Sequence, residues 1–372
     1  MVFVGNTGSF PPDHCGVDGH HVPSSVVAVT PIIAEKPYIS IDDRGLYSLN
    51  VPRLERDKTG PTTNFAAADS IDFSSVYVAS PIDSAATINA KLSQGLHLVL
   101  TPGTYTLDAA INVTHPNTIV LGIGLPILQP AAATPCIVVA AVDGVRVAGL
   151  ILQAGRLRSS ALLLFGSADH KGADSNPSFI HDVYARVGGL NDPDDYQVSV
   201  DNIMVIASGH VVVDNVWLWR ADHDVKGAVY NSSNYAGTGL VVEGGNVTAY
   251  GVAVEHTLQD LLQWNGDDGR LFFYQSEFPY DVTQDNYADR GFVSYRVADG
   301  VLAHEAVGVG MYSFFRDHAV NMKTAAQTGT SSGVKITHAC TKFLNGQGSI
   351  AHVVNALGQS TSSASDPPVY VC

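Results

Sequence analysis

Three glutamates with similar neighbours are the residues of this sequence best suited to acid–base chemistry. Glu255, Glu277 and Glu305 each lie in a short segment in which apolar and polar residues alternate. Two carboxyl groups can hydrolyse a glycosidic bond, because one protonates the leaving oxygen while the other activates a water molecule. The side chains can cooperate in this way only if the backbone stacks their segments beside one another.

Segments of similar length, each close to a glycine and followed by a polar loop, recur along much of the chain. Irregular repetition of short β-rich segments is typical of a solenoid. The sequence therefore predicts an all-β fold in which the segments stack as the rungs of a parallel β-helix. The first strand residues of these segments are expected to align, namely Val145, Val211, Val247, Leu271, Val301 and Val334.

Within most rungs the apolar residues change phase after the third position. Because side chains alternate along a strand, this change of phase predicts a bend inside each rung. Polar and aromatic residues would then share one outward-facing strip. We expect that strip to carry Asn215, Trp217, Trp219, Glu255, Gln275, Glu277, Glu305, His338 and Cys340.

Two pairs of glutamates on this strip have a spacing suited to catalysis. Glu277 and Glu305 would lie on neighbouring rungs, two residues apart along the strands, which puts their Cα atoms roughly 8 Å apart. Carboxyl groups about 6.5–9.5 Å apart suit hydrolysis with inversion. Glu255 and Glu277 form a second diagonal pair, so spacing alone does not choose between the pairs. The alternative is that outward glutamates only make the surface soluble, although the neighbouring indoles are costly to expose.

Composition argues against some classes of partner. The formal net charge of −15 argues against binding of nucleic acid and, more weakly, against a polyanionic polysaccharide. No apolar run approaches the length of a membrane span, so no membrane partner is expected. A polysaccharide lyase would need a basic residue on the strip, and the central rungs have none. A neutral glycan is easier to reconcile with these features.

Cysteines and histidines support weaker predictions. A terminal strand that folds back could join Cys340 to Cys372 in a disulfide. The histidines show no metal-ligand spacing, so neither a metal ion nor another cofactor is expected. The first residues do not have the features of a signal peptide. A mature secreted chain would begin in the same way, and an extracellular location is expected.

The chain divides into a lead-in and a coil. Residues 1–80 lack the rung pattern and are expected to pack along the coil, whereas residues 81–372 would form a single β-helix domain with a C-terminal tail. One amphipathic helix, at 84–96, would cap the coil, with Ser84 as its N-cap. Long lateral loops would border a binding groove, and they are expected at 167–177, 188–197, 222–235 and 257–269.

Several long blocks of the sequence resemble glycoside hydrolase family 55, the β-1,3-glucanases. They include VWLWRADH, NVTAYGVAVEHT, WNGDDGRLFFYQSEFPYD and VLAHEAVGVGMY, between residues 216 and 312. The resemblance implies a right-handed, pectin-lyase-like parallel β-helix that hydrolyses β-1,3-glucan with inversion. It also implies that this chain corresponds to the second of two tandem β-helices. A further β-helix domain or chain would then complete the cleft.

Matching of motifs to this family assigns roles to two of the candidate residues. Glu305 of HEAVGVG would be the general acid, and Glu277 of YQSEFPYD would hold the attacking water. Glu255, Gln275 and His304 would support them. The expected substrate contacts are Trp217, Trp219, Asp222, His223, Tyr274, Tyr280 and Trp264. Two alternatives remain open, a glycan-binding β-helix without turnover and, less favoured, a polysaccharide lyase.

Overall fold

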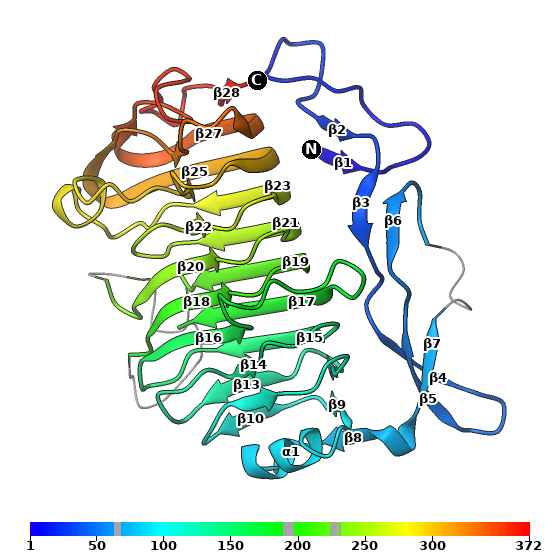
Figure 1. Ribbon diagram of the computed structural model, residues 1–372. Coiled ribbons are helices and arrows are strands. Elements are labelled where there is room, and N and C mark those ends of the chain that lie inside the picture. The colour runs from blue at the N-terminus through cyan, green and yellow to red at the C-terminus, as the bar shows by residue number, and fades with distance from the viewer. Residues whose placement is uncertain (63–67, 189–196, 224–228, 230–231) are drawn as a thin grey trace.

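The computed structural model describes residues 1–62, 68–188, 197–223, 229 and 232–372. Most of its elements are strands, and two large sheets hold the greater part of them (Figure 1). One sheet is 13-stranded and the other is 8-stranded. Among the described residues, no helix has both the length and the apolar character that crossing a membrane requires.

The strands of the two large sheets have the following bounds. The larger sheet contains β8 (Val76–Ala79), β9 (His97–Leu100), β10 (Thr104–Leu107), β12 (Ile119–Gly122), β13 (Ile127–Pro130), β15 (Arg146–Gln153), β17 (Ser178–Val187), β19 (Val211–Arg220), β21 (Thr248–Glu255), β23 (Gly269–Glu277), β25 (Ala303–Met322), β27 (Gly333–Ile350) and β28 (Val369–Val371). The smaller contains β11 (Ile111–Val113), β14 (Ile137–Val139), β16 (Ser159–Phe165), β18 (Val200–Ile206), β20 (Ala236–Val242), β22 (Leu262–Trp264), β24 (Tyr295–Val297) and β26 (Ala326–Gln327).

Successive strands from β15 to β27 belong alternately to the larger and the smaller sheet. Each turn of the chain therefore adds one parallel strand to both sheets, and the rungs stack in sequence order (Figure 1). The stacking aligns apolar side chains into ladders that fill the space between the sheets, because they leave water only when rungs are superposed. One such ladder, buried throughout, consists of Val147, Ile180, Val213, Ala249, Leu271 and Ala306.

The predicted bend within each rung is confirmed. At one register position of the larger sheet, every rung from β15 to β27 has a residue with positive φ, between 50° and 72°. The left-handed conformation interrupts the alternation of side chains, which explains the change of phase read from the sequence. The stacked residues are Gly149, Asp182, Asn215, Gly251, Phe273, Gly308 and His338.

The predicted register is correct for the first rungs and wrong for two later ones. The strand that enters the register of Val211 and Val247 next begins at Gly269 rather than Leu271, and the following one at His304 rather than Val301. The inward position is taken by a glycine, Gly269, because the Trp264 indole fills the space beside it. A Cβ added there would lie 2.2 Å from the ring. The sequence reading also missed an entire rung strand, β17.

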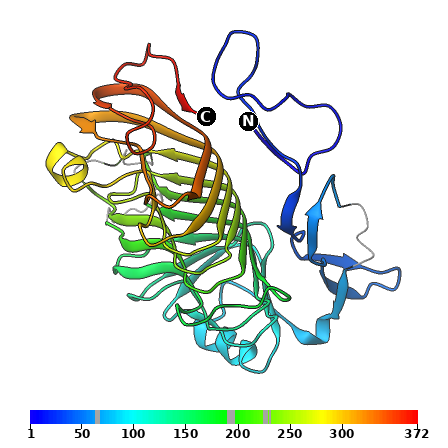
Figure 2. The ribbon, with the colours of Figure 1, turned by 45° about the horizontal axis from the view of Figure 1, so that its top comes forward.

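The lead-in packs along the larger sheet (Figure 2). Ile32 and Ala34 join a buried cluster with outward-facing side chains of the rungs, and the Tyr250 hydroxyl donates to the Ile32 carbonyl at 2.8 Å. Its strands form three small sheets, built from β1 (Val2–Val4) with β2 (Ser25–Val27), β3 (Thr30–Ile33) with β6 (Glu55–Lys58), and β4 (Tyr38–Ile41), β5 (Tyr47–Val51) and β7 (Asp69–Asp72). This packing covers the outer face of the rungs on the N-terminal side of the bend.

The two ends of the coil are closed differently. At the first rung, helix α1 (Ala85–Leu92) buries Ala85, Ile88 and Leu92, and the Ser84 hydroxyl accepts from the Thr87 N–H as predicted. At the last rung, β28 folds back antiparallel onto β27. The described residues also contain two short helices, η2 (Phe73–Ser75) and the π-helix η3 (Gln284–Ala288).

The predicted Cys340–Cys372 disulfide is wrong. Cys372 is bonded to Cys15 instead, because the lead-in runs back along the coil and brings its first residues beside the C-terminus (Figure 1). Cys340 remains a free thiol, opposite Tyr370 in the β27–β28 pair.

The predicted lateral loops have mixed outcomes. The stretch at 257–269 is not an insertion, since it contains β22. Most of the loop expected at 188–197, and half of the loop expected at 222–235, lie outside the described residues.

Candidate active site

Glu255 and Glu277 are direct register partners on the neighbouring strands β21 and β23. Trp219 precedes them in the same row, on β19, and Tyr312 follows on β25. The row lies on the C-terminal side of the bend, where the outer face of the sheet is not covered by the lead-in clusters. Because adjacent parallel strands are about 4.8 Å apart, the two carboxylates belong to one site.

Each carboxylate has its own hydrogen-bond donor. The Trp217 indole N–H donates to Glu255 Oε2 at 3.1 Å, and the Tyr280 hydroxyl donates to Glu277 Oε1 at 2.8 Å. Trp217 approaches Glu255 from β19, whereas Tyr280 comes from the segment that follows Glu277's own strand. The Gln275 amide also interacts with Glu255. These separate anchors fix the orientation of two acidic groups that would otherwise repel each other.

The two carboxyl groups differ in acidity. Burial raises the pKa of Glu277 to about 7 against the opposing hydrogen bond from Tyr280, and the negative charges of Glu255 and Asp222 add smaller contributions in the raising direction. Burial also raises the pKa of Glu255, but hydrogen bonds from Trp217 and Gln275 oppose this rise. When the pKa values of two neighbouring carboxyl groups differ in this way, the group with the higher pKa suits the role of general acid and the other suits the role of base.

Aromatic rings extend the site beyond the carboxylates. The Trp217 and Trp219 rings are stacked with centroids 4.7 Å apart, and Trp217 is 38% exposed whereas Trp219 is buried. The His223 ring lies 5.0 Å from Trp219, and Tyr280 contacts Phe314 at 5.0 Å. Exposed indole faces suit the apolar faces of sugar rings, so Trp217 offers a stacking surface next to Glu255.

Asp222 links the exposed and buried parts of the site. One of its oxygens lies 2.8 Å from His223 Nδ1, and the other lies 3.8 Å from His256 Nε2. His256 is buried, which lowers the pKa of its imidazole to about 4, and its ring packs 4.3 Å from Tyr280. A neutral His256 therefore supports the ring whose hydroxyl holds Glu277.

A fully buried ion pair underlies this cluster. The Arg220 guanidinium donates to both Asp281 oxygens, at 2.8 and 2.7 Å, and neither side chain is exposed. The Ser232 N–H donates to Asp281 as well, and Arg220 also donates to the carbonyls of Ser233 and His256. The pair joins the end of β19, which carries the tryptophans, to the segment that carries Tyr280.

The structure therefore brings together eight of the predicted site residues and separates four others from them. The grouped residues are Glu277, Glu255, Gln275, Trp217, Trp219, Asp222, His223 and Tyr280.

Glu305 is not beside Glu277. It pairs with Arg270 and Lys335 near the start of β25, and the partner of Glu277 on that strand is Tyr312, seven positions further and beyond the bend. The expected diagonal between Glu277 and Glu305 is wrong, because the rung of Glu305 begins at His304. Glu305 is exposed between two basic side chains, in a surface depression on the other side of the bend.

Tyr274, Trp264 and His304 belong to the core rather than to a substrate surface. Tyr274 and Trp264 have no exposed area, so the predicted contact with substrate is wrong for both. The His304 ring packs 4.6 Å from Trp264 and hydrogen-bonds the Tyr295 hydroxyl through Nε2. Burial lowers the pKa of His304 to about 3. All three side chains are buried, that of Tyr274 on β23, that of Trp264 on β22 and that of His304 at the start of β25.

The sequence reading missed His256, Phe314 and the Arg220–Asp281 pair. Asp281 lies 61 residues from its partner, so no local spacing could have indicated the pair. The one available signal was that an arginine directly follows an apolar strand, where its charge requires a partner.

Comparison with known proteins places these features in context. The LAM55 pectate lyase-like domain family matches residues 76–277. An exo-beta-1,3-glucanase from Streptomyces sp. (strain SirexAA-E / ActE) is 34% identical over 357 residues, which are 94% of this chain and 58% of the relative. The chain thus spans well under two thirds of the length of that curated relative.

Two solved structures from the same organism superpose closely. The structure of sacteLam55A from Streptomyces sp. SirexAA-E has a TM-score of 0.93 at 33% identity, covering 100% of this chain and 67% of the other. A variant of sacteLam55A in complex with glucose has a TM-score of 0.90 at 32% identity, covering 100% and 66%.

Proposed function

The chain belongs to the LAM55 pectate lyase-like domain family, the glycoside hydrolase family 55 expected from its sequence, and we propose that it hydrolyses β-1,3-glucan with Glu277 as the general acid. One observation carries the assignment. Glu277 and Glu255 pair in register on the part of the sheet face that lies outside the lead-in clusters, have pKa values that burial raises to different extents, and lie beside the exposed Trp217. The relative from Streptomyces is an exo-beta-1,3-glucanase, which supports the substrate class.

The proposed mechanism uses the two carboxyls in different states. Protonated Glu277 donates its proton to the glycosidic oxygen, and the bond between that oxygen and the anomeric carbon breaks. Ionised Glu255 accepts a proton from a water molecule, whose oxygen attacks the same carbon. We propose that the attack comes from the opposite face and inverts the anomeric configuration, because the family resemblance implies it. Register partners on strands about 4.8 Å apart are closer than the roughly 6.5–9.5 Å that suits inversion, so the two carboxyl groups must diverge from their strands to admit the water. Detection of the first-formed anomer by NMR would test inversion directly.

We infer a right-handed sense for the coil, because connections between parallel strands of one sheet are right-handed in almost all cases. We also propose that the protein is secreted. The Cys15–Cys372 disulfide supports this location, since disulfides persist in oxidising compartments. The proposed substrate, a glucan polysaccharide, is also found outside the cell.

The decisive experiment compares Glu277→Gln with Glu305→Gln in glucose release from a soluble β-1,3-glucan. Loss of general-acid catalysis costs about 10²–10⁴ in rate, so Glu277→Gln should reduce kcat at least about a hundredfold. Glu305→Gln is the matched control, because it makes the same chemical change on a neighbouring strand. If Glu305→Gln abolished release and Glu277→Gln did not, the assignment of the acid would be wrong.

One observation favours a second candidate function, glycan binding without turnover. The chain spans 58% of the length of its enzyme relative, and the carboxylate row lies outside the lead-in clusters that cover the other part of the sheet face. A second β-helix, in this polypeptide or another, would then supply the opposite wall of the cleft. Binding of β-1,3-glucan with no glucose release from the unmodified chain, and no change in binding on Glu277→Gln, would favour this function over hydrolysis.

A further inference from the structure

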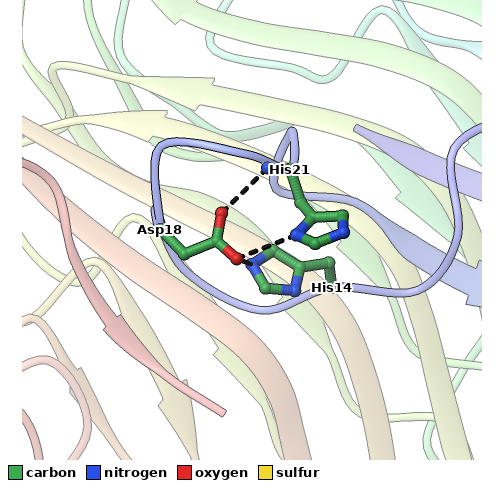
Figure 3. Close-up of side chains that lie close together, drawn as sticks. All are labelled: His14, Asp18 and His21. Carbon is green, nitrogen blue, oxygen red and sulfur yellow. Dashed lines mark hydrogen bonds and ion pairs between the residues drawn. The ribbon is translucent and has the colours of Figure 1, made fainter.

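Three potential metal ligands meet in a loop of the lead-in, well away in sequence from the carboxylate row. His14, Asp18 and His21 each offer one ligand atom, and these atoms lie within 4.8 Å of one another. Figure 3 shows both imidazoles turned toward the Asp18 carboxylate. The sequence reading expected no metal, because the spacing of these residues matches no familiar ligand pattern. Closure of the loop creates the cluster.

The distances fit a single shared ion. Asp18 Oδ2 lies 2.8 Å from His21 Nδ1 and 3.5 Å from His14 Nε2. Ligand atoms about 2.0–2.2 Å from a tetrahedral zinc ion are roughly 3.3 Å from one another. Small movements of the side chains would therefore admit the ion without a change in the backbone.

The nitrogen of His14 supplies a second, independent observation. His14 Nε2 is buried and makes no hydrogen bond within the described part of the chain. A buried polar atom without a hydrogen bond is costly, and this one has only the longer contact with Asp18 Oδ2 at 3.5 Å. A metal ion between the two would satisfy it.

The loop is also held in the shape that the ligands require. Asp18 Oδ1 accepts hydrogen bonds from the N–H groups of His20 and His21, both at 2.8 Å, which leaves Oδ2 directed at the imidazoles. His14 and Ser24 exchange backbone hydrogen bonds at the base of the loop, and the adjacent Cys15 is fixed by its disulfide. Outer hydrogen bonds of this kind orient the ligands of metal sites.

We propose that His14, Asp18 and His21 bind a divalent transition-metal ion of the zinc class. Two imidazoles and one carboxylate suit Zn²⁺, whereas Ca²⁺ and Mg²⁺ prefer sites made of oxygen ligands. The ion stabilises the loop that is tied to the C-terminus by Cys15. Its role is structural, and it is independent of the hydrolysis proposed for Glu277.

The test is calorimetric titration of the chelator-treated full chain with ZnCl₂, with CaCl₂ as a parallel probe. One Zn²⁺ should bind per chain, and His21→Ala should weaken binding by at least about tenfold, since loss of a ligand costs no less than loss of an outer-shell partner. His21 is half exposed, so this change leaves the fold intact. His20→Ala is the matched control, because it removes the adjacent imidazole that lies outside the cluster, and Zn²⁺ binding should be unchanged.

A second readout does not depend on affinity alone. Zn²⁺ should raise the thermal unfolding midpoint of the parent and of His20→Ala, but not that of His21→Ala. Lack of Zn²⁺ binding by the parent at micromolar concentrations would overturn the proposal. Equal weakening by His20→Ala and His21→Ala, or equal binding of Ca²⁺ and Zn²⁺, would also overturn it.

Discussion

At the scale of single residues, burial rather than sequence motif distinguishes the two carboxyls of the site. Glu255 and Glu277 occupy the same register position on adjacent strands, yet Glu277 retains its proton up to a higher pH. Burial dominates at both, and the hydrogen bonds that each accepts decide the remainder. Because Tyr280 donates to Glu277 and opposes the rise in its pKa, the Tyr280 hydroxyl controls the pH at which the acid is lost.

Tyr280→Phe should therefore move the alkaline limb of the pH–rate profile upward. Glucanase activity should fall as pH rises through about 7, where Glu277 loses its proton. Removing the hydroxyl removes a hydrogen bond that favours the ionised carboxylate, so the pKa of Glu277 should rise by roughly half a unit or more. The measurement is kcat/KM against pH for both proteins, with Glu305→Gln as a control that keeps the parental limb. A downward shift on Tyr280→Phe would contradict the assigned direction.

At the scale of elements, the stacked left-handed residues set the position of the site. The bend separates the part of each outer face that packs against the lead-in from the part that carries the carboxylates. It also explains why the sequence predicted the coil well and the site only partly. Ladders of Val, Leu and Ile at alternate positions predict rungs and their bend from local pattern alone.

Register between rungs is less predictable, because it depends on which residue fills the space at the start of a strand. One rung begins at Gly269, where the Trp264 indole takes the place of an inward side chain, rather than at Leu271. The rung of His304 begins three residues later than expected. Because of this difference in register, Glu305 lies on the other side of the bend from the site to which the sequence assigned it. Burial is likewise not visible in a motif, so Tyr274 and Trp264 were assigned to the surface although they lie in the core.

Gly251→Val should destabilise the coil, whereas Gly251→Asn should be tolerated. Gly251 has φ of 61°, and the Asn215 backbone at 3.8 Å would be the nearest atoms to an added Cβ, so strain rather than collision decides the outcome. A β-branched residue at positive φ costs about 1–3 kcal/mol. Asn is the natural control, since Asn215 adopts φ of 60° at the same position of the neighbouring rung. Urea unfolding of the two variants checks the difference, and equal stabilities would show that the bend does not require this conformation.

At the scale of the whole molecule, the two ends of the chain meet at the last rungs. The lead-in runs back along the full stack, and Cys15 joins Cys372 across 357 residues of sequence (Figures 1 and 2). Such a bond restricts the unfolded chain, and its loss typically costs about 2–5 kcal/mol. The last rung is therefore held both by β28 and by a covalent link to the lead-in.

The double change Cys15→Ser with Cys372→Ser should lower the thermal unfolding midpoint by several degrees. Cys340→Ser is the control, because Cys340 is the free thiol that the sequence suggested as the partner. Its replacement should leave the midpoint nearly unchanged. A larger loss from Cys340→Ser than from the double change would indicate that the stabilising bond is not Cys15–Cys372.

The same disulfide determines how the protein would respond to force. A stack of rungs pulled apart from its two ends should unravel turn by turn, since each rung is held mainly by its neighbours. Here a pull applied at Met1 and Cys372 would load the sulfur–sulfur bond and leave the intervening rungs slack. Single-molecule stretching should give an extension of only the short segment outside the covalent loop, and full unravelling should appear only after reduction.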